Sequence, residues 1–173
     1  MLSMGFINVE IKAICKNPQQ VEQLLIATGA DYKGEDHQID TYFNISDGRL
    51  KLREGNIENA LIYYRRNNEE GPKVSNVILY KSKPDPNLKQ ILTESVGIKV
   101  IVDKRRKIFY LNNIKFHIDN VNELGHFMEI EAIDMEGHGD REKLQRQCKK
   151  YMDLLKITQN DLIADSYSDM LKK

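Results

Sequence analysis

The sequence predicts an α+β protein in which a few helices accompany an antiparallel β-sheet or barrel. Alternation of polar and apolar residues, the period of a strand, recurs along most of the chain. Asp47-Gly48 and Asn112-Asn113 have the composition of tight turns between neighbouring strands. Helical stripes of apolar residues are few and short, so strands dominate the prediction.

Eight segments read as strands, each with one charged or polar face and one apolar face. In chain order they are Phe6–Ile14, Gln38–Asn44, Arg49–Glu54, Ala60–Arg66, Val74–Lys81, Lys99–Leu111, Ile114–Val121 and Phe127–Ile133. The stretch Asn67–Lys73 is rich in Asn, Glu and Gly, and we expect a loop there.

Four segments read as helices. Asn17-Pro18 predicts an N-cap and first turn for a helix that stops at Gly29. A second helix carries Leu88, Ile91, Leu92 and Val96 and stops at Gly97.

The other two helices follow the last strand. Asp140 caps a helix whose apolar stripe includes Leu144, Cys148 and Tyr151, and Thr158 with Asp161 predicts a capping pair for a short final helix. We expect the helices to cover the outer faces of the strands.

The charges on the polar strand faces are segregated by sign. Arg49, Lys51 and Arg53 share one strand face, whereas Glu129 and Glu131 share another. Converging cations repel one another unless an anion lies between them. A carboxylate pair at i and i+2 offers oxygen ligands to Mg²⁺ or Mn²⁺. The pattern therefore predicts a wet barrel interior that holds a polyanion and a metal ion, although a solvated charged face of an interaction protein is the alternative.

Composition indicates which partners to expect. The 173 residues predict a single domain, with the barrel at about 5–134 and a helical segment at about 140–173. The 26 basic and 26 acidic residues cancel, which argues against nucleic acid or a membrane surface as a partner. Cys15 and Cys148 form no metal-binding spacing, and no signal peptide is evident, so we expect a reduced, cytoplasmic protein.

The segments also resemble a known family, the CYTH or triphosphate tunnel metalloenzyme superfamily, and within it the bacterial class IV adenylate cyclase-like branch. The resemblance rests on ordered matches between residues 8 and about 133. They are Glu10-Ile11-Lys12, Gln38 to Phe43, Gly48 to Arg53, Leu61 to Arg66, Lys104-Arg105-Arg106, His117 to Val121 and Leu124 to Glu131. The resemblance implies an eight-stranded antiparallel barrel with peripheral helices, a small-molecule triphosphate substrate and bound Mg²⁺ or Mn²⁺.

Family roles carry over to individual positions. The metal-binding candidates are Glu10, Asp119, Glu129 and Glu131. The triphosphate-binding candidates are Lys12, Arg49, Lys51, Arg53, Arg66, Lys104 and Arg106, to which Lys81 is added as a further cation on a polar strand face, and the candidates for a part in catalysis are Lys12, Arg53 and Glu10. Of the four histidines, His117 is the one that could face the interior, next to Asp119.

Two positions leave alternatives open. The family motif begins with Glu, but this chain has Asn8 there, which removes one negative charge and puts a second metal ion in doubt. In the Tyr63-Tyr64-Arg65-Arg66 segment, Arg66 is two residues after Tyr64, so the side chains of Arg66 and Tyr64 have the same parity: they point to the same face of the strand. We favour Arg66 over Arg65 as the inward residue.

Three functions are compatible with these residues and are given in our order of preference. The first is a class IV adenylate cyclase-like enzyme that converts ATP to cyclic AMP and pyrophosphate. The second is a triphosphatase acting on inorganic, thiamine or nucleoside triphosphate. The third is a non-catalytic binder of nucleotide or polyphosphate. A homodimer is compatible with each of them.

Overall fold

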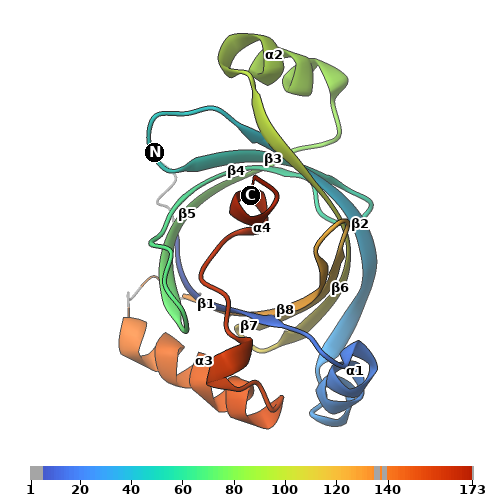
Figure 1. Cartoon of the computed structure of the whole chain (residues 1–173), viewed down its shortest axis with the longest axis vertical. Helices are drawn as coiled ribbons and strands as arrows, with labels where there is room; N and C mark the ends of the chain where they lie inside the picture. The colour runs from blue at the N-terminus through green and yellow to red at the C-terminus, as the bar shows by residue number, and fades with distance from the viewer. Residues whose placement is uncertain (1–5, 135–136, 138–139, 173) are drawn as a thin grey trace.

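The computed structural model describes residues 6–134, 137 and 140–172, so residues 5 and 173 of the predicted boundaries lie outside the described part. Eight antiparallel strands form a closed barrel in the order β1-β5-β4-β3-β2-β6-β7-β8 (Figure 1). The strands are β1 (Phe6–Ile14), β2 (Asp31–Phe43), β3 (Arg49–Gly55), β4 (Ala60–Arg65), β5 (Lys73–Lys81), β6 (Ile98–Leu111), β7 (Ile114–Val121) and β8 (Gly125–Ile133). The prediction of an α+β fold around an eight-stranded antiparallel barrel is confirmed.

Strand β2 is longer than predicted. Its first half, Asp31 to His37, consists almost wholly of polar residues and gave no alternating signal, but it pairs with β6 from Arg105 to Tyr110. Cross-strand hydrogen bonding to β6 overrides the weak local propensity here.

The helices are α1 (Pro18–Ala27), α2 (Pro86–Val96), α3 (Arg141–Leu154) and α4 (Tyr167–Met170), with a 3₁₀ turn η1 (Gln159–Asp161). The predicted caps form, because Asn17 Oδ1 accepts from Gln20 N and Asp140 Oδ1 accepts from Lys143 N. Thr158 and Asp161 make a capping box around η1.

The main apolar core lies outside the barrel wall, between β1, β7 and β8 and the helices α1 and α3. It joins outward residues of the strands, such as Val9, Phe116 and Ile130, to Leu25 of α1 and Tyr151 of α3. The rings of Phe116 and Tyr151 meet edge to face, with their centroids 5.0 Å apart. Because the apolar faces of these strands point outward, their polar faces point into the barrel, as predicted.

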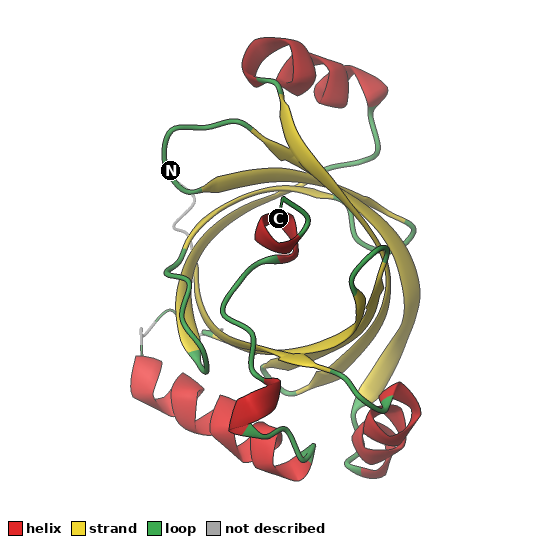
Figure 2. Ribbon diagram, in the orientation of Figure 1, coloured by secondary structure: helices red, strands yellow, loops and turns green. Residues whose placement is uncertain are grey.

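The C-terminal segment does not remain on the outside. After α3 the chain crosses the end of the barrel, and α4 lies within its opening when the barrel is viewed end-on (Figure 2). Ala13 pairs with Leu162, Ile163 N donates to Lys12 O, and the Lys73 ammonium donates to the carbonyls of Ile163 and Ala164. The expectation that helices cover only outer faces therefore misses α4.

Helix α2 stands away from the barrel wall and buries none of its residues. Across the described residues, no helix has the length and apolar character needed to cross a membrane. Cys15 and Cys148 are both buried and free.

A charged cavity inside the barrel

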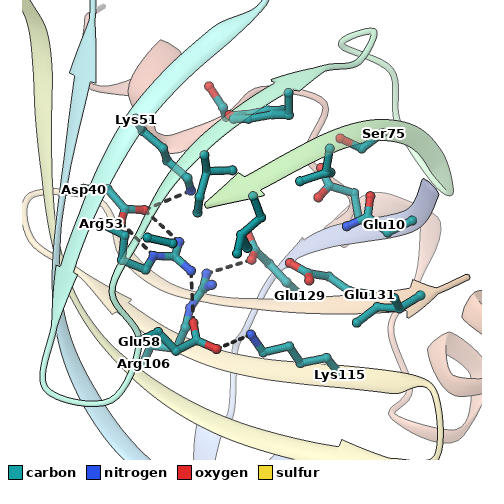
Figure 3. Close-up of a pocket in the computed structure, with 18 of the residues that line it drawn as sticks. Glu10, Asp40, Lys51, Arg53, Glu58, Ser75, Arg106, Lys115, Glu129 and Glu131 are labelled. Atoms are coloured by element: carbon teal, nitrogen blue, oxygen red, sulfur yellow. Dashed lines mark hydrogen bonds and ion pairs between the residues drawn. The ribbon is translucent and has the colours of Figure 1, made fainter. Parts of the chain in front are cut away.

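The barrel encloses a cavity of about 540 Å³ to which every strand contributes side chains. It is lined by cations, carboxylates and a patch of apolar residues (Figure 3). The basic lining residues are Lys12, Lys51, Arg53, Arg66, Lys81, Lys104, Arg106 and Lys115, and the acidic ones are Glu10, Asp40, Glu58, Glu129 and Glu131.

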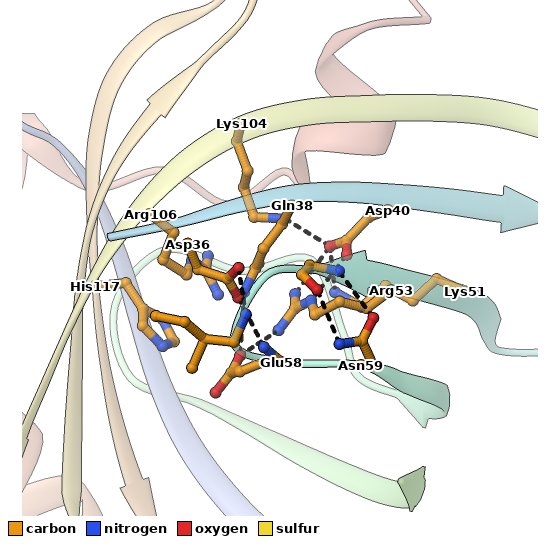
Figure 4. A network of polar contacts seen from close by, with 12 residues as sticks. Asp36, Gln38, Asp40, Lys51, Arg53, Glu58, Asn59, Lys104, Arg106 and His117 are labelled. Atoms are coloured by element: carbon orange, nitrogen blue, oxygen red, sulfur yellow. Dashed lines mark hydrogen bonds and ion pairs between the residues drawn. The ribbon is translucent and has the colours of Figure 1, made fainter. Parts of the chain in front are cut away.

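On one side of the cavity, three cations converge on Asp40 of β2. Arg53 pairs with both carboxylate oxygens, at 2.8 and 2.9 Å, and Lys51 and Lys104 lie 3.0 and 2.7 Å from Oδ2 (Figure 4). Asp40 and Arg53 are directly opposite each other in the β2–β3 register, which fixes the pairing. Burial alone would raise the pKa of Asp40, but Arg53, Lys104 and Lys51 outweigh it and hold that pKa well below its usual range.

Burial also lowers the pKa of Lys104 to about 7, although Asp40 counteracts the shift. A bound polyanion would raise this pKa again, so binding of tripolyphosphate at pH 8 should take up protons.

Isothermal titration calorimetry in buffers of different ionisation enthalpy would measure the proton uptake. Lys104→Met should reduce the proton uptake, whereas Lys107→Met, which changes a lysine paired with Glu22 on the outside of the same strand, should leave it unchanged. Equal uptake in wild type and Lys104→Met would contradict this assignment.

On the other side of the cavity, His117, Glu129 and Glu131 form a group whose ligand atoms all lie within 4.8 Å of one another. The adjacent strands β7 and β8 bring the group together, because His117 lies opposite Glu129 in the register, and Glu10 of β1 lies opposite Glu131 on the other side of β8. Burial lowers the pKa of His117 to about 3, so its ring is neutral and keeps a lone pair at neutral pH.

The two glutamates of this group differ in their surroundings. Burial raises the pKa of Glu131 to about 7. Burial acts on Glu129 too, but Arg106 at 2.7 Å and Lys12 at 3.2 Å hold the pKa of Glu129 well below its usual range. A divalent cation bound next to Glu131 would favour its ionised form, as Arg106 and Lys12 do for Glu129. Nδ1 of His117 lies 3.2 Å from Glu129 Oε2 and 3.7 Å from Glu131 Oε1, so one imidazole nitrogen and two carboxylates offer a donor set that fits a metal ion.

The predicted residue Glu10 lies beside this group and not within it. Its carboxylate pairs with Arg66 Nη1 at 2.5 Å. Arg66 points inward, with its side chain 2% exposed, whereas Arg65 is 61% exposed and pairs with Asp47. Asn8 also lines the cavity, and its buried Oδ1 has no partner among the described residues.

Asp119 has other partners than those expected of a metal ligand. Its oxygens accept from Arg106 Nε and Nη2, at 2.7 and 2.6 Å, and from the Tyr167 hydroxyl at 2.8 Å. It is fully buried behind Arg106 and does not line the cavity. Its position suits it to orient Arg106, which in turn reaches Glu129.

Two of the predicted phosphate-binding residues, Arg49 and Lys81, lie at the edges of the cavity or outside it. Arg49 is absent from the cavity lining and instead contacts Asn68 and Asp169, at 2.8 and 3.0 Å, beside a second pocket. Lys81 lines the cavity but is exposed at its mouth. The remaining predicted cations, Lys12, Lys51, Arg53, Arg66, Lys104 and Arg106, face the interior together.

Sequence reasoning missed several lining residues. Asp40 and Lys115 obey the period-two alternation of β2 and β7, so parity could have found them. Glu58 lies in a loop, and Tyr167 follows the last strand by more than thirty residues, so neither carries a local signal. Tyr167 lies under Lys12, whose Nζ is 3.5 Å from the ring centroid.

One part of the cavity wall is apolar. On β4 and β5 the inward positions include Ile62, Tyr64, Val77 and Leu79, and Ile62 lies opposite Leu79 while Tyr64 lies opposite Val77. Phe6 of β1 lies opposite Val77 and extends the patch. The charged walls and this apolar wall share one cavity.

A closed antiparallel barrel whose interior carries converging cations and an acidic cluster defines the class of triphosphate tunnel proteins. The model of the CYTH domain matches residues 7–167. The chain belongs to the CYTH family.

Individual relatives agree with this assignment. A Methanocaldococcus jannaschii protein named "putative adenylate cyclase" is 25% identical over 95% of this chain and 98% of its own length. The structure of a "putative adenylate cyclase" from Vibrio parahaemolyticus superposes with a TM-score of 0.79 at 16% identity, covering 98% of this chain and 99% of that one.

A Hippeastrum protein, described as a "putative adenylyl cyclase" with a dominant triphosphatase activity, superposes with a TM-score of 0.59 at 15% identity. The superposition covers 96% of this chain and 93% of that chain. At these identities the two structures establish the shared fold.

Proposed function

We propose that this protein is a metal-dependent enzyme that binds a nucleoside triphosphate inside the barrel and acts as a class IV adenylate cyclase-like lyase. One observation carries the proposal: a wall of converging cations faces the same cavity as Glu129 and Glu131, the carboxylates of the group that could hold a metal ion. Cations that hold phosphate oxygens beside a divalent metal ion are what phosphoryl and nucleotidyl transfer require.

The roles follow from the contacts. Glu129, Glu131 and His117, with Glu10 beside them, would hold Mg²⁺ or Mn²⁺. The bound ion would polarise the phosphorus under attack and neutralise charge on its oxygens.

The phosphates would be held by the inward cations of the cavity. Lys12 and Arg53 would contact the reacting part of the triphosphate, and Lys51, Arg66, Lys104 and Arg106 would hold its remaining oxygens. Asp119 would orient Arg106, while Arg49 and Lys81 would act at the edges.

In the cyclase reaction, the ribose 3′-hydroxyl attacks the α-phosphorus, the bond to the bridging oxygen breaks, and pyrophosphate leaves. The cavity cations would stabilise the negative charge that develops on the leaving group. The names of the Methanocaldococcus and Vibrio relatives are consistent with this reaction.

The apolar wall favours a substrate with an organic group over inorganic triphosphate. Ile62, Val77 and Leu79 present no charge to a phosphate but offer a surface for a base or another ring. Leu79→Ser should therefore weaken ATP binding about fivefold and leave tripolyphosphate binding unchanged.

Ile78→Ser is the matched control, because Ile78 is the next residue on β5, points to the other face and is 49% exposed against 37% for Leu79. Equal loss of affinity for ATP and tripolyphosphate, or loss in the control, would contradict a role for this wall in recognising the base.

A triphosphatase is the second candidate, supported by the activity stated for the Hippeastrum protein. There, water attacks the terminal phosphorus and orthophosphate leaves. A non-catalytic nucleotide or polyphosphate binder is the third candidate, since Asn8 offers a neutral oxygen in place of a carboxylate.

Product analysis by ³¹P NMR, after incubation with ATP and Mg²⁺ or Mn²⁺, distinguishes the candidates. Pyrophosphate with cyclic AMP is the expected result. Orthophosphate with ADP would replace the cyclase by a triphosphatase, and unchanged ATP together with metal-independent binding would favour the binder. A cytoplasmic location, a small-molecule triphosphate as partner rather than nucleic acid or a membrane, and a homodimer remain part of this proposal.

A further inference from the structure

The loop between β3 and β4 brings an acidic side chain, Glu58, into the cavity. The loop is held by Asp36 of β2, which is fully buried and accepts hydrogen bonds from the backbone nitrogens of Ile57 and Glu58, both at 2.9 Å. Asn59 fastens the other side of the loop, donating to Gly55 O at 2.8 Å and accepting from Gly55 N at 3.1 Å. Glu58 is therefore presented by a well-anchored turn.

Three donors from three different strands converge on the Glu58 carboxylate. Arg53 Nη1 lies 3.1 Å and Gln38 Nε2 lies 3.2 Å from Oε2, and the Lys115 ammonium contacts Oε1 (Figures 3 and 4). Burial would raise the pKa of Glu58, but Lys115 and Arg53 outweigh it and keep the group ionised. Two cations and an amide N–H around one anion is the donor set that phosphate oxygens take in proteins.

Glu58 differs from Asp40, the other anion that contacts Arg53. The Asp40 side chain is 2% exposed and belongs to a strand, whereas the Glu58 side chain is 23% exposed and belongs to a loop. Arg53 uses Nε and Nη2 for Asp40 and Nη1 for Glu58, so a ligand could replace Glu58 while Asp40 keeps Arg53 in place. Of the two anions, Glu58 is the displaceable one.

We propose that Arg53, Lys115 and Gln38 form a phosphate subsite, and that Glu58 occupies it as an internal substitute for phosphate oxygens until a triphosphate displaces it. The proposal rests on the proposed function, because it names a further part of the same triphosphate site. It makes Glu58 a determinant of affinity: each bound triphosphate must break the ion pairs of Glu58 with Arg53 and Lys115.

The test measures the dissociation constant of tripolyphosphate, without added metal, by isothermal titration calorimetry. Glu58→Gln should lower the dissociation constant about tenfold, because the neutral amide competes less well for the two cations. Glu54→Gln is the matched control: Glu54 also lies near the end of β3 and is ion-paired, but its partner is Lys89 of α2, outside the cavity. It should bind tripolyphosphate like wild type.

Repeating the Glu58→Gln measurement in a protein that also carries Lys115→Met distinguishes two explanations for tighter binding: a phosphate subsite freed by the substitution, and a general change in the charge of the cavity. If Lys115 belongs to the subsite, most of the gain from Glu58→Gln disappears when Lys115 is replaced. A gain that persists there would mean that Glu58 acts only through its field, and the subsite would be refuted. Unchanged or weaker binding by Glu58→Gln would also refute it. If Glu58→Gln destabilises the loop, the test is repeated with Glu58→Ala. The melting temperature of that variant is compared with that of wild type.

The proposed function has a separate outcome. If wild type and Glu58→Gln both fail to bind tripolyphosphate and ATP, the triphosphate site itself is wrong. If wild type binds and Glu58→Gln shows no gain, only the subsite is wrong.

Discussion

Glu131→Gln is expected to lower metal-dependent turnover by about 100-fold or more, because it removes a negative ligand from the group formed with Glu129 and His117. Substitution of Glu131 tests the metal assignment more specifically than substitution of Glu129. Glu129 also accepts from Arg106 and pairs with Lys12, so its replacement would release two buried cations as well.

Turnover at several Mn²⁺ concentrations, together with tripolyphosphate binding without metal, would test this prediction. Metal-free binding should be retained, since the variant keeps the cations of the opposite wall. Glu54→Gln again serves as the control, because its carboxylate contacts Lys89 outside the cavity. Full activity of Glu131→Gln, or loss of activity equal to that of the control, would overturn the metal assignment. A chelator should abolish wild-type turnover by the same argument.

Arg66→Met is expected to weaken triphosphate binding about 100-fold, because removing a buried, paired cation from a polyanion site costs about 2–5 kcal/mol. The replacement also leaves Glu10 without its cation at the metal side of the cavity, which should lower turnover further. The apparent KM for triphosphate and the melting temperature would both be measured.

The neighbouring residue provides a matched control. Arg65 is adjacent in sequence and carries the same side chain, but it points outward and pairs with Asp47. Arg65→Met should leave KM within about twofold of wild type, because an exposed ion pair contributes little. If the two variants behave alike, or if Arg65→Met has the larger effect, the inward orientation of Arg66 would not matter for binding.

The sequence was most informative where side-chain direction follows from local alternation. Lys12, Lys51, Lys104 and Arg106 point into the barrel as their parity indicates, and Val9 and Ile130 pack outward against the helices. Parity holds along a strand because successive side chains leave on opposite faces, whatever the neighbouring strand is. The same rule chose Arg66 over Arg65.

Parity could not show which inward groups would meet. His117 joins Glu129 and Glu131 because β7 pairs with β8 in one particular register, and Lys104 reaches Asp40 because β6 lies beside β2. Asp119 has inward parity too, yet Arg106 and Tyr167 use its oxygens. A one-residue change in register would send any of these side chains to the other face.

The sequence by itself therefore determined that the barrel is charged within and apolar outside, because alternation and charge sign are local properties of each strand. The tertiary structure alone decided how those charges are paired. Contacts such as Arg49–Asp169, Lys73–Ile163 and Lys115–Glu58 join residues that are far apart in the chain. They depend on the closure of the barrel, the path of the C-terminal segment and the anchored loop that carries Glu58. No local pattern encodes these features, because burial and strand order bring the partners together only in the folded chain.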